Sequence, residues 1–371
     1  MQSLPSFMRA VVLVGHGGLD MLRYREDWPR PDARAGEVLI QVQACGLNNT
    51  DINTRTGWYS RAVTSGTAEN ASRGFGDAAA SGGSWGDRTQ QFPRIQGADV
   101  AGMIVAVGHG VERARIGERV MVDPWLLGLG DWMDAGRSDY FGSECDGGFA
   151  DFTTVLSENA IAVNSTLSAA ELATFPCAYT TAENLISRTG LRPGETVALA
   201  GASGGVGTAA IQLCRLRGAR VIAIAAASKA SALIELGAHI VVDRATENLE
   251  GAIREAAGGA VDVALDVVGG QTFMHLINAL RQGGRYSASG AISGPVAQFD
   301  LRQMIYKDLQ LTGATIVSPG TMQRIVRLIE QRLLQPVLAQ TFALRDLAAA
   351  QEIFMAKKHV GNIVVTMTEA K

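Results

Sequence analysis

The stretch that decides the fold is Val197-Ala-Leu-Ala-Gly201-Ala-Ser-Gly204-Gly205-Val-Gly207, which is followed by a helical run over residues 208–216. An apolar run, a glycine-rich turn and a helix in this order are typical of a dinucleotide-binding unit. The glycines let the backbone approach a pyrophosphate closely, and unpaired N–H groups at the start of the helix favour an anion. The stretch therefore predicts a dinucleotide site at the N-terminus of this helix.

Helices and short buried strands alternate around this turn. We expect strands over 196–200, 220–225, 239–242, 261–267 and 284–288, and helices over 168–188, 207–217, 228–236, 247–257 and 272–280. Because parallel strands need crossover helices, the alternation predicts an α/β fold with a doubly wound parallel sheet.

The flanking segments have a different pattern. Residues 8–14, 37–44, 101–107 and 119–122 have the apolar clustering of strands, and the tail adds helices over 321–334 and 344–357 and a strand over 361–367. We therefore expect two domains, one made of residues 1–167 and 319–371 and the other, inserted into it, of residues 168–318.

Composition limits the class of protein. The chain has 371 residues and a net charge of −3, so it predicts neither nucleic acid nor an anionic membrane as a partner. The four cysteines include no CxxC pair, which argues against a disulfide framework or a zinc knuckle. No apolar run reaches membrane-spanning length, and residues 1–9 have no basic region followed by an apolar stretch. We expect a cytoplasmic protein with reduced cysteines.

Short motifs along nearly the whole chain carry a family resemblance. They are ACGLNNTD (44–51), TGWYS (56–60), PRIQGADVAG (93–102), IGERV (116–120), DGGFAD (146–151), PCAYTT (176–181), the glycine turn, DVVG (266–269) and VGNIV (360–364). In this order and spacing the chain resembles the medium-chain dehydrogenase/reductase superfamily, most closely its zinc-independent NADPH:quinone oxidoreductase-like branch. The resemblance implies a GroES-like β-rich catalytic domain around a Rossmann domain, with the site in the cleft between them.

The motifs depart from those of the superfamily's zinc alcohol dehydrogenases, which take catalytic ligands from Cys, His and Cys. Asn48 and Ala98 occupy the first two positions here, and only Cys177 keeps a thiol. The stretch expected to hold a structural zinc contains Cys145 as its single cysteine. That stretch also carries the aromatic residues Trp125, Trp132, Tyr140 and Phe141. Because zinc needs about four N, S or O ligands, we expect no metal at either site. We interpret Cys177 as a small buried residue, with a redox or ligand role as the alternative.

Tyr59 is the leading catalytic candidate. Its spacing from the 48–51 motif matches both the quinone oxidoreductases and the 2-enoyl thioester reductases. In the 2-enoyl thioester reductases a tyrosine at this place donates a proton. The alternative for Tyr59 is a partly buried aromatic residue capping the cleft. Thr50 falls where the zinc dehydrogenases keep a proton-relay hydroxyl, although a local turn explains it equally well. Asn48 replaces a zinc ligand and is a candidate donor to a substrate carbonyl or to the nicotinamide amide, and Asp51 is interpreted as structural.

The residues after the second and third expected strands favour NADPH. NAD-preferring sites place an acidic residue about 20 residues beyond the turn, but this chain has Ala225-Ala-Ala-Ser228-Lys229 there. Lys229 and Arg244 suit a 2′-phosphate, and the alternative for each is a solvated surface charge. The complete set of expected cofactor contacts is Thr181, Ser203, Gly204, Gly205, Val206, Gly207, Ser228, Lys229, Arg244, Val268, Ser289, Gly290 and Asn362.

The sequence thus predicts a zinc-independent, NADPH-dependent oxidoreductase that transfers hydride to a quinone or to the C=C bond of an α,β-unsaturated carbonyl. The alternatives are a 2-enoyl thioester reductase, an alcohol dehydrogenase, and a non-enzymatic NADPH-binding protein that needs no hydroxyl at Tyr59. We expect a small-molecule substrate. We also expect a homodimer that is joined through an edge strand at 309–317. The Gly-, Ala- and Ser-rich segment 61–91 is either a mobile surface loop or a lid.

Overall fold

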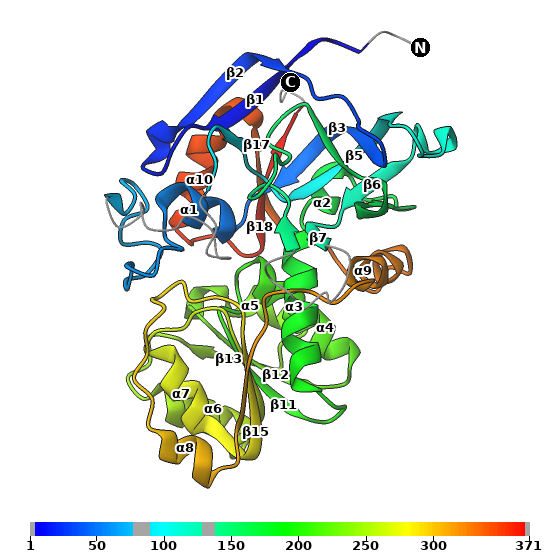
Figure 1. Cartoon of the computed structure of the whole chain (residues 1–371). Coiled ribbons are helices and arrows are strands. Elements are labelled where there is room, and N and C mark those ends of the chain that lie inside the picture. Colours follow the sequence, from blue (N-terminus) through cyan, green and yellow to red (C-terminus); the bar gives the residue numbers. More distant parts are fainter. Residues whose placement is uncertain (1–3, 77–89, 128–137, 368–371) are drawn as a thin grey trace.

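The computed structural model describes residues 4–76, 90–127 and 138–367, which form two domains stacked along one long axis (Figure 1). Strands β11–β16 and the helices between them form the domain drawn at the bottom, here called the parallel-sheet domain. The remaining strands form the β-rich domain above it, which carries both ends of the described chain.

The parallel-sheet domain confirms the predicted doubly wound sheet. Its strand order is β13-β12-β11-β14-β15-β16, and every ladder in it is parallel. The strands are β11 (Thr196–Ala200), β12 (Arg220–Ala225), β13 (Ile240–Asp243), β14 (Val261–Asp266), β15 (Leu280–Ala288) and β16 (Gln310–Gly313). The helices are α4 (Gly205–Leu216), α5 (Ala230–Glu235), α6 (Leu249–Ala257), α7 (Thr272–Ala279) and α8 (Leu301–Tyr306). Residues 197–200 of β11 are all buried, as expected of a strand covered on both faces.

The β-rich domain combines both ends of the sequence in one sheet. Its main sheet has the order β10-β6-β5-β3-β18-β17, with β9 also pairing with β3, and a second sheet has the order β2-β1-β4. The main strands are β3 (Glu37–Gly46), β5 (Asp99–Val107), β6 (Arg119–Val122), β9 (Phe152–Leu156), β10 (Ala160–Ala162), β17 (Leu338–Ala343) and β18 (Asn362–Thr366). The others are β1 (Phe7–Leu13), β2 (Leu22–Pro29), β4 (Arg94–Ile95), β7 (Trp125–Leu127) and β8 (Ser138–Tyr140). Its helices are α1 (Asn49–Thr56), α9 (Thr321–Glu330) and α10 (Leu347–Met355).

The prediction of a single helix over 168–188 is wrong. The chain forms α2 (Ala169–Leu172), which Ser168 and Glu171 cap, and then a separate helix α3 (Pro176–Thr189). Pro176 has no N–H and occupies the first turn of α3, where none is needed. Two further helices begin later than expected, because residues 227–229 and 344–346 form 3₁₀ turns first.

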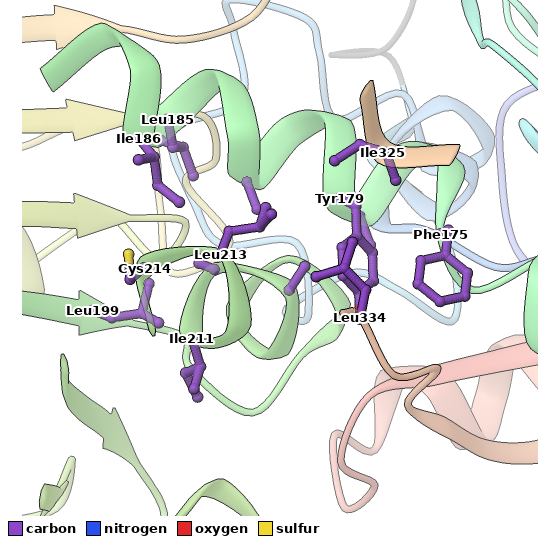
Figure 2. Packing of buried hydrophobic residues seen from close by; sticks show 14 of the residues in the cluster. Phe175, Tyr179, Leu185, Ile186, Leu199, Ile211, Leu213, Cys214, Ile325 and Leu334 are labelled. Atoms are coloured by element: carbon purple, nitrogen blue, oxygen red, sulfur yellow. The ribbon is translucent and has the colours of Figure 1, made fainter. Parts of the chain in front are cut away.

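Helix α3 lies at the junction of the domains and packs on α4 (Figure 2). Tyr179 of α3 is fully buried, and its ring centre lies 4.5 Å from that of Phe175. Its hydroxyl donates to the carbonyl oxygen of Gln335 and accepts from Nε2 of Gln212, both over 2.7 Å. These bonds tie α3 both to α4 and to the segment that leads into β17.

The domain bounds 1–167 with 319–371 and 168–318 remain a proposal. Helix α2 lies within the range assigned to the dinucleotide domain, yet it packs on β3, β5 and β18 of the β-rich domain. Among the helices of the described ranges, none is both long and apolar enough to cross a membrane.

Candidate functional site

A cavity of about 460 Å³ lies at the carboxyl ends of β11, β12 and β14, beside the glycine turn. Gly201 has a φ of 73°, which favours glycine. A Cβ at Gly207 would overlap the carbonyl oxygen of Gly201, and one at Gly205 would overlap Oδ1 of Asn362. Close packing within the protein thus requires glycine at both positions, and the turn places the N-terminus of α4 beside the cavity, as a pyrophosphate site requires.

Four basic side chains line this cavity: Lys229, Arg244, Lys357 and His359. No Asp or Glu is among its described lining residues. Lys229 Nζ donates to Ser203 Oγ (3.2 Å) and to the carbonyl oxygens of Lys357 (2.8 Å) and His359 (2.6 Å). Burial, and then the charge of Arg244, lower the pKa of Lys229. The cavity is therefore electropositive, which fits the phosphates of a dinucleotide.

The structure brings most of the expected cofactor residues to this cavity. Those that line it are Ser203, Gly204, Gly205, Val206, Gly207, Lys229, Arg244 and Val268. Ser228 is exposed on the 3₁₀ turn and does not line it. Asn362 contributes indirectly by packing against Gly205. Ser289 and Gly290 follow the end of β15, and the buried Ser289 hydroxyl has no hydrogen-bond partner. An unpaired buried hydroxyl of this kind suits a polar ligand.

Several lining residues come from the β-rich domain and were not expected from the sequence. They are Asn49, Phe354, Lys357, His359 and Gly361. The Gly361 N–H donates to the carbonyl oxygen of Ser203 over 2.9 Å, and a β-bridge joins Gly361 to Gly204. The basic run over residues 357–359, directly before the VGNIV motif, was the feature of the sequence that could have indicated these lining residues.

Around Asn48, an amide–carboxylate pair lies where the zinc dehydrogenases hold their metal. Asn48 Nδ2 donates to Asp99 Oδ2 (2.9 Å), and Asp99 Oδ1 accepts from the backbone N–H of Cys177 (2.7 Å). Asp51 accepts from the backbone N–H groups of Asn48 (2.8 Å) and Gly97 (3.2 Å), so it holds the loop as expected. One N–H of the Asn48 amide is therefore committed to Asp99. Across the described ranges, no group of three or more His, Cys, Asp or Glu could hold a metal ion.

Burial raises the pKa values of Asp51 and Asp99 to about 7 each, and the Asp99 charge raises that of Asp51 further. The hydrogen bonds from Asn48 to both carboxyl groups oppose this rise. Near neutral pH both carboxyl groups are therefore only partly ionised.

Tyr59 lies just beyond the end of α1, where Gly57 adopts a left-handed φ of 76° and turns the chain back. Burial raises the pKa of Tyr59 to about 12, and the neighbouring side chains of Asn53 and Thr50, which lie three residues apart on α1, oppose this rise. The phenol is therefore protonated at physiological pH. The structure thus joins two of the expected catalytic residues, and Asn53 is a neighbour that the sequence did not indicate.

An apolar wall adjoins this cluster. Trp125 and Tyr140 meet edge to face with ring centres 5.1 Å apart, and they pack with Cys177, Ile316 and Val317. The Tyr140 hydroxyl hydrogen-bonds with the Cys177 thiol. Burial raises the pKa of that thiol to about 12, so Cys177 is neutral, in keeping with a small buried residue. Trp132, which was expected in the same region, lies outside the described residues.

The segment after α1 crosses from the β-rich domain to the other. The N–H of Thr67 donates to the carbonyl oxygen of Ile292, a cavity residue, over 3.0 Å. Trp58 Nε1 donates to the carbonyl oxygen of Ser65 over 2.9 Å and so closes a turn within the segment. Residues 61–76 and 90–91 of the expected insertion are described, whereas 77–89 lie outside the described residues.

A cavity that suits a dinucleotide in a doubly wound domain, together with a β-rich domain that completes its lining, is typical of a nicotinamide-dependent oxidoreductase. Family models match both parts, an alcohol dehydrogenase GroES-like domain over residues 34–165 and a zinc-binding dehydrogenase over 205–331. A solved structure of a putative alcohol dehydrogenase from Sinorhizobium meliloti is 45% identical, with a TM-score of 0.89, over 99% of this chain and 98% of that one.

Two characterised relatives are more distant. Acryloyl-coenzyme A reductase from Metallosphaera sedula is 26% identical over 97% of this chain and 100% of its own. Quinone oxidoreductase from Rattus norvegicus is 26% identical over 97% of this chain and 98% of its own. The chain belongs to the medium-chain dehydrogenase/reductase superfamily, in its quinone oxidoreductase-like branch.

Proposed function

We propose that the protein is a zinc-independent reductase that uses NADPH to reduce a quinone or the C=C bond of an α,β-unsaturated carbonyl. The observation that carries the proposal is the half-buried Tyr59 phenol, with Asn53 and Thr50 as neighbours, beside the amide–carboxylate pair of Asn48 and Asp99. These groups supply hydrogen-bond donors for a substrate oxygen without needing a metal.

NADPH is favoured over NADH by the charges at the adenosine end of the cavity. Lys229 and Arg244 lie there, and no described lining residue is acidic, so nothing would repel a 2′-phosphate. Arg244 is exposed and follows β13 directly, and its backbone N–H bonds the carbonyl oxygen of Ala225. Because the Lys229 ammonium is already engaged by three oxygens, we assign Arg244 the larger share of this preference.

In the proposed reaction, each group of residues has a separate role. NADPH supplies a hydride when it is bound. Tyr59 donates a hydrogen bond to the substrate carbonyl oxygen as negative charge develops there, and Thr50 and Asn53 hold the phenol in position. The apolar side chains of Trp125, Tyr140, Ile316 and Val317 pack together beside this cluster and would keep water from a quinone or enone bound there.

A screen of cofactor oxidation tests the proposal. NADPH and NADH would each be mixed with short quinones, short enones and enoyl thioesters, with an alcohol plus NADP⁺ as the reverse control. Faster turnover with NADPH and a quinone or enone is expected. Turnover confined to the alcohol would instead show an alcohol dehydrogenase. Binding without turnover on any acceptor would show a nucleotide-binding protein.

A 2-enoyl thioester reductase is the second candidate. Its support is the Tyr59 position, together with the similarity to a protein named acryloyl-coenzyme A reductase. A preference for acryloyl or crotonyl thioesters over the matching enone would favour it.

Two further properties belong to the proposal. We propose a homodimer joined through β16, which is argued in the Discussion. We also propose a cytoplasmic location, because none of the described cysteines is paired in a disulfide. Recovery of the native protein in a membrane or secreted fraction would contradict this location.

A further inference from the structure

The segment that follows Tyr59 is a part of the chain to which the proposed reaction gives no role. Residues 60–75, here called the crossing segment, leave the end of α1 and then return to that helix. At the far end of the segment, the Phe75 N–H donates to the carbonyl oxygen of Thr56, the last residue of α1, over 2.9 Å. The crossing segment is therefore a loop whose two ends lie at the same helix.

The middle of the crossing segment lies against the parallel-sheet domain. The Thr67 N–H donates to the carbonyl oxygen of Ile292 over 3.0 Å, and Thr67 is only 2% exposed. A Cβ at Gly66 would lie 2.8 Å from the same carbonyl oxygen, and one at Gly294 would lie 3.5 Å from the carbonyl oxygen of Thr64. The two backbones are therefore in direct contact, and the contact leaves no room for a side chain at Gly66.

The crossing segment connects the two halves of the candidate site. It begins at the residue after Tyr59, whose ring packs edge to face on Trp58 with ring centres 5.7 Å apart. The indole N–H of Trp58 donates to the carbonyl oxygen of Ser65, inside the segment, over 2.9 Å. The middle of the segment contacts Ile292, which lines the dinucleotide cavity together with Ser293. The segment thus runs from the proposed hydrogen-bond donor to the rim of the cofactor cavity.

Elsewhere, packed side chains and paired backbone hold the two domains together. Ile316 and Val317, which follow β16, are buried and pack with Trp125 of the β-rich domain. Near the glycine turn, the Gly361 N–H donates to the carbonyl oxygen of Ser203. On the α1 side the contact is made by a loop, the crossing segment, and binding residues of a rigid scaffold are commonly carried by such loops. This is the side from which we expect a substrate to approach the phenol.

We propose that the crossing segment is a specificity-determining element, which admits a small free acceptor and excludes one that is carried on a long phosphopantetheine arm. An acyl carrier that approached the phenol from the α1 side would collide with the backbone of the segment, and such a collision discriminates against the larger ligand. A short quinone or enone needs no path for an arm. The proposal rests on the proposed function, and it names the class of acceptor as a small molecule without a carrier.

Two thioesters with the same acyl group test the proposal without relying on turnover. Butyryl-N-acetylcysteamine has only the end of the arm, whereas butyryl-coenzyme A has all of it, and neither has a C=C bond that could accept hydride. Calorimetry on the NADP⁺ complex should show that the wild type binds the small thioester at least about tenfold more tightly. In Gly66→Val the two affinities should lie within about threefold of each other, because the new side chain collides with the Ile292 carbonyl oxygen and displaces the segment.

Ala68→Val is the matched control, since Ala68 is an exposed residue of the same segment, and it should discriminate between the thioesters as the wild type does. Hydrogen exchange shows whether the segment has moved, because the Thr67 N–H should exchange faster in Gly66→Val and at the normal rate in Ala68→Val. Undiminished discrimination in a folded Gly66→Val with fast Thr67 exchange overturns the proposal.

The comparison on the wild type does not depend on the folding of a variant. Wild-type protein that binds butyryl-coenzyme A as tightly as the small thioester, or that binds neither of them, overturns the proposal as well. Clear discrimination between the thioesters, with no turnover on any acceptor, would overturn only the proposed reaction.

Discussion

At the scale of single residues, burial keeps several polar groups of the candidate site neutral or only partly ionised. Tyr59 is held protonated by burial, Cys177 is a neutral thiol, and Asp51 and Asp99 are both perturbed. A site composed of neutral donors stabilises developing negative charge on a substrate without first binding an anion in its place.

Replacing Tyr59 by Phe tests the role of its hydroxyl. We expect kcat to fall about 100-fold, because the principal donor to the substrate oxygen is removed, while NADPH affinity stays the same. Steady-state kinetics and calorimetry on the same samples measure both effects. Tyr306→Phe is the control, since Tyr306 is 72% exposed on α8. Unchanged kcat in Tyr59→Phe would leave Tyr59 as an aromatic cap of the cleft.

The buried carboxyl groups predict a pH dependence of stability. The pKa of Asp99 is about 7 in the folded protein and 3.8 in the reference state, so the folded state holds a proton that the unfolded state has lost between about pH 4 and 7. Stability should therefore fall as the pH rises through this range, by at most about 4 kcal/mol for Asp99. Asp99→Asn should flatten the profile, because it removes the titrating carboxyl group, and Asn48 can turn its amide to present an oxygen to the new side chain.

Thermal unfolding at pH 5 and pH 8 measures this difference, with Glu352→Gln as the control because Glu352 is exposed on α10. An equal fall of Tm in Asp99→Asn and the wild type would contradict the assigned titration.

At the scale of elements, Arg55 joins helix α1 to its surroundings. Its side chain is fully buried, yet all its partners are neutral: Gln351 Oε1 (2.8 Å) and the carbonyl oxygens of Gly17 (2.9 Å) and Ala71 (2.9 Å). Burial accordingly lowers its pKa to about 10. One guanidinium thus fixes α10, the loop before β2 and the segment that follows Tyr59.

Replacing Arg55 by Met should destabilise the fold by about 3 kcal/mol or more, because one buried and two partly buried acceptors lose their donor. Urea unfolding measures this loss. Arg55→Lys should lie in between, since an ammonium can reach only some of the acceptors. Arg73→Met, at an exposed position of the same segment, should change the free energy of unfolding by less than about 0.5 kcal/mol. A loss of similar size in Arg73→Met would show that the method does not isolate the buried bonds.

Local pattern was sufficient to predict some elements and not others. The strands predicted at 196–200 and 220–225 match β11 and β12 in both bounds. A short, continuous apolar run between two turns is typical of a buried strand, so few other structures fit it. The break before Pro176 was missed because residues 168–188 are helical in pattern on both sides of it. Helix α1 has little apolar character, and its buried polar face depends on partners distant in the sequence, such as Gln351.

The same distinction holds for the site. The glycine turn and Arg244 were predicted because each belongs to a short motif or follows a strand, and both line the cavity. Lys357 could not be placed, since it reaches the cavity only through the pairing of β17 and β18 with the first half of the chain. The hydrogen bonds of Lys229 could not be predicted for the same reason, because two of its three acceptors are carbonyl oxygens of residues 357 and 359, far away in the sequence.

At the scale of the whole molecule, the parallel sheet ends in an edge. Strand β16 pairs only with β15 among the described strands, in the region where the sequence predicted an edge at 309–317, although β16 itself covers only Gln310–Gly313. The segment that leads into β16 carries an exposed apolar set. Its members are Val296 (63% exposed), Leu301 (59%), Ile305 (58%) and Tyr306 (72%). An unpaired edge next to exposed apolar side chains is a surface that proteins usually cover.

A second copy of the chain would cover both features at once, because two β16 edges related by a two-fold axis can pair and bring the two apolar sets together. Ile305→Glu combined with Tyr306→Glu should therefore convert a dimer into a monomer, since the added charges would repel and desolvate across the contact. Light scattering coupled to size exclusion measures the mass. Ile353→Glu is the matched control, because Ile353 is 45% exposed on α10 in the other domain and should leave the dimer intact. A monomeric wild type, or a dimer that survives the double substitution, would show that β16 is not the contact.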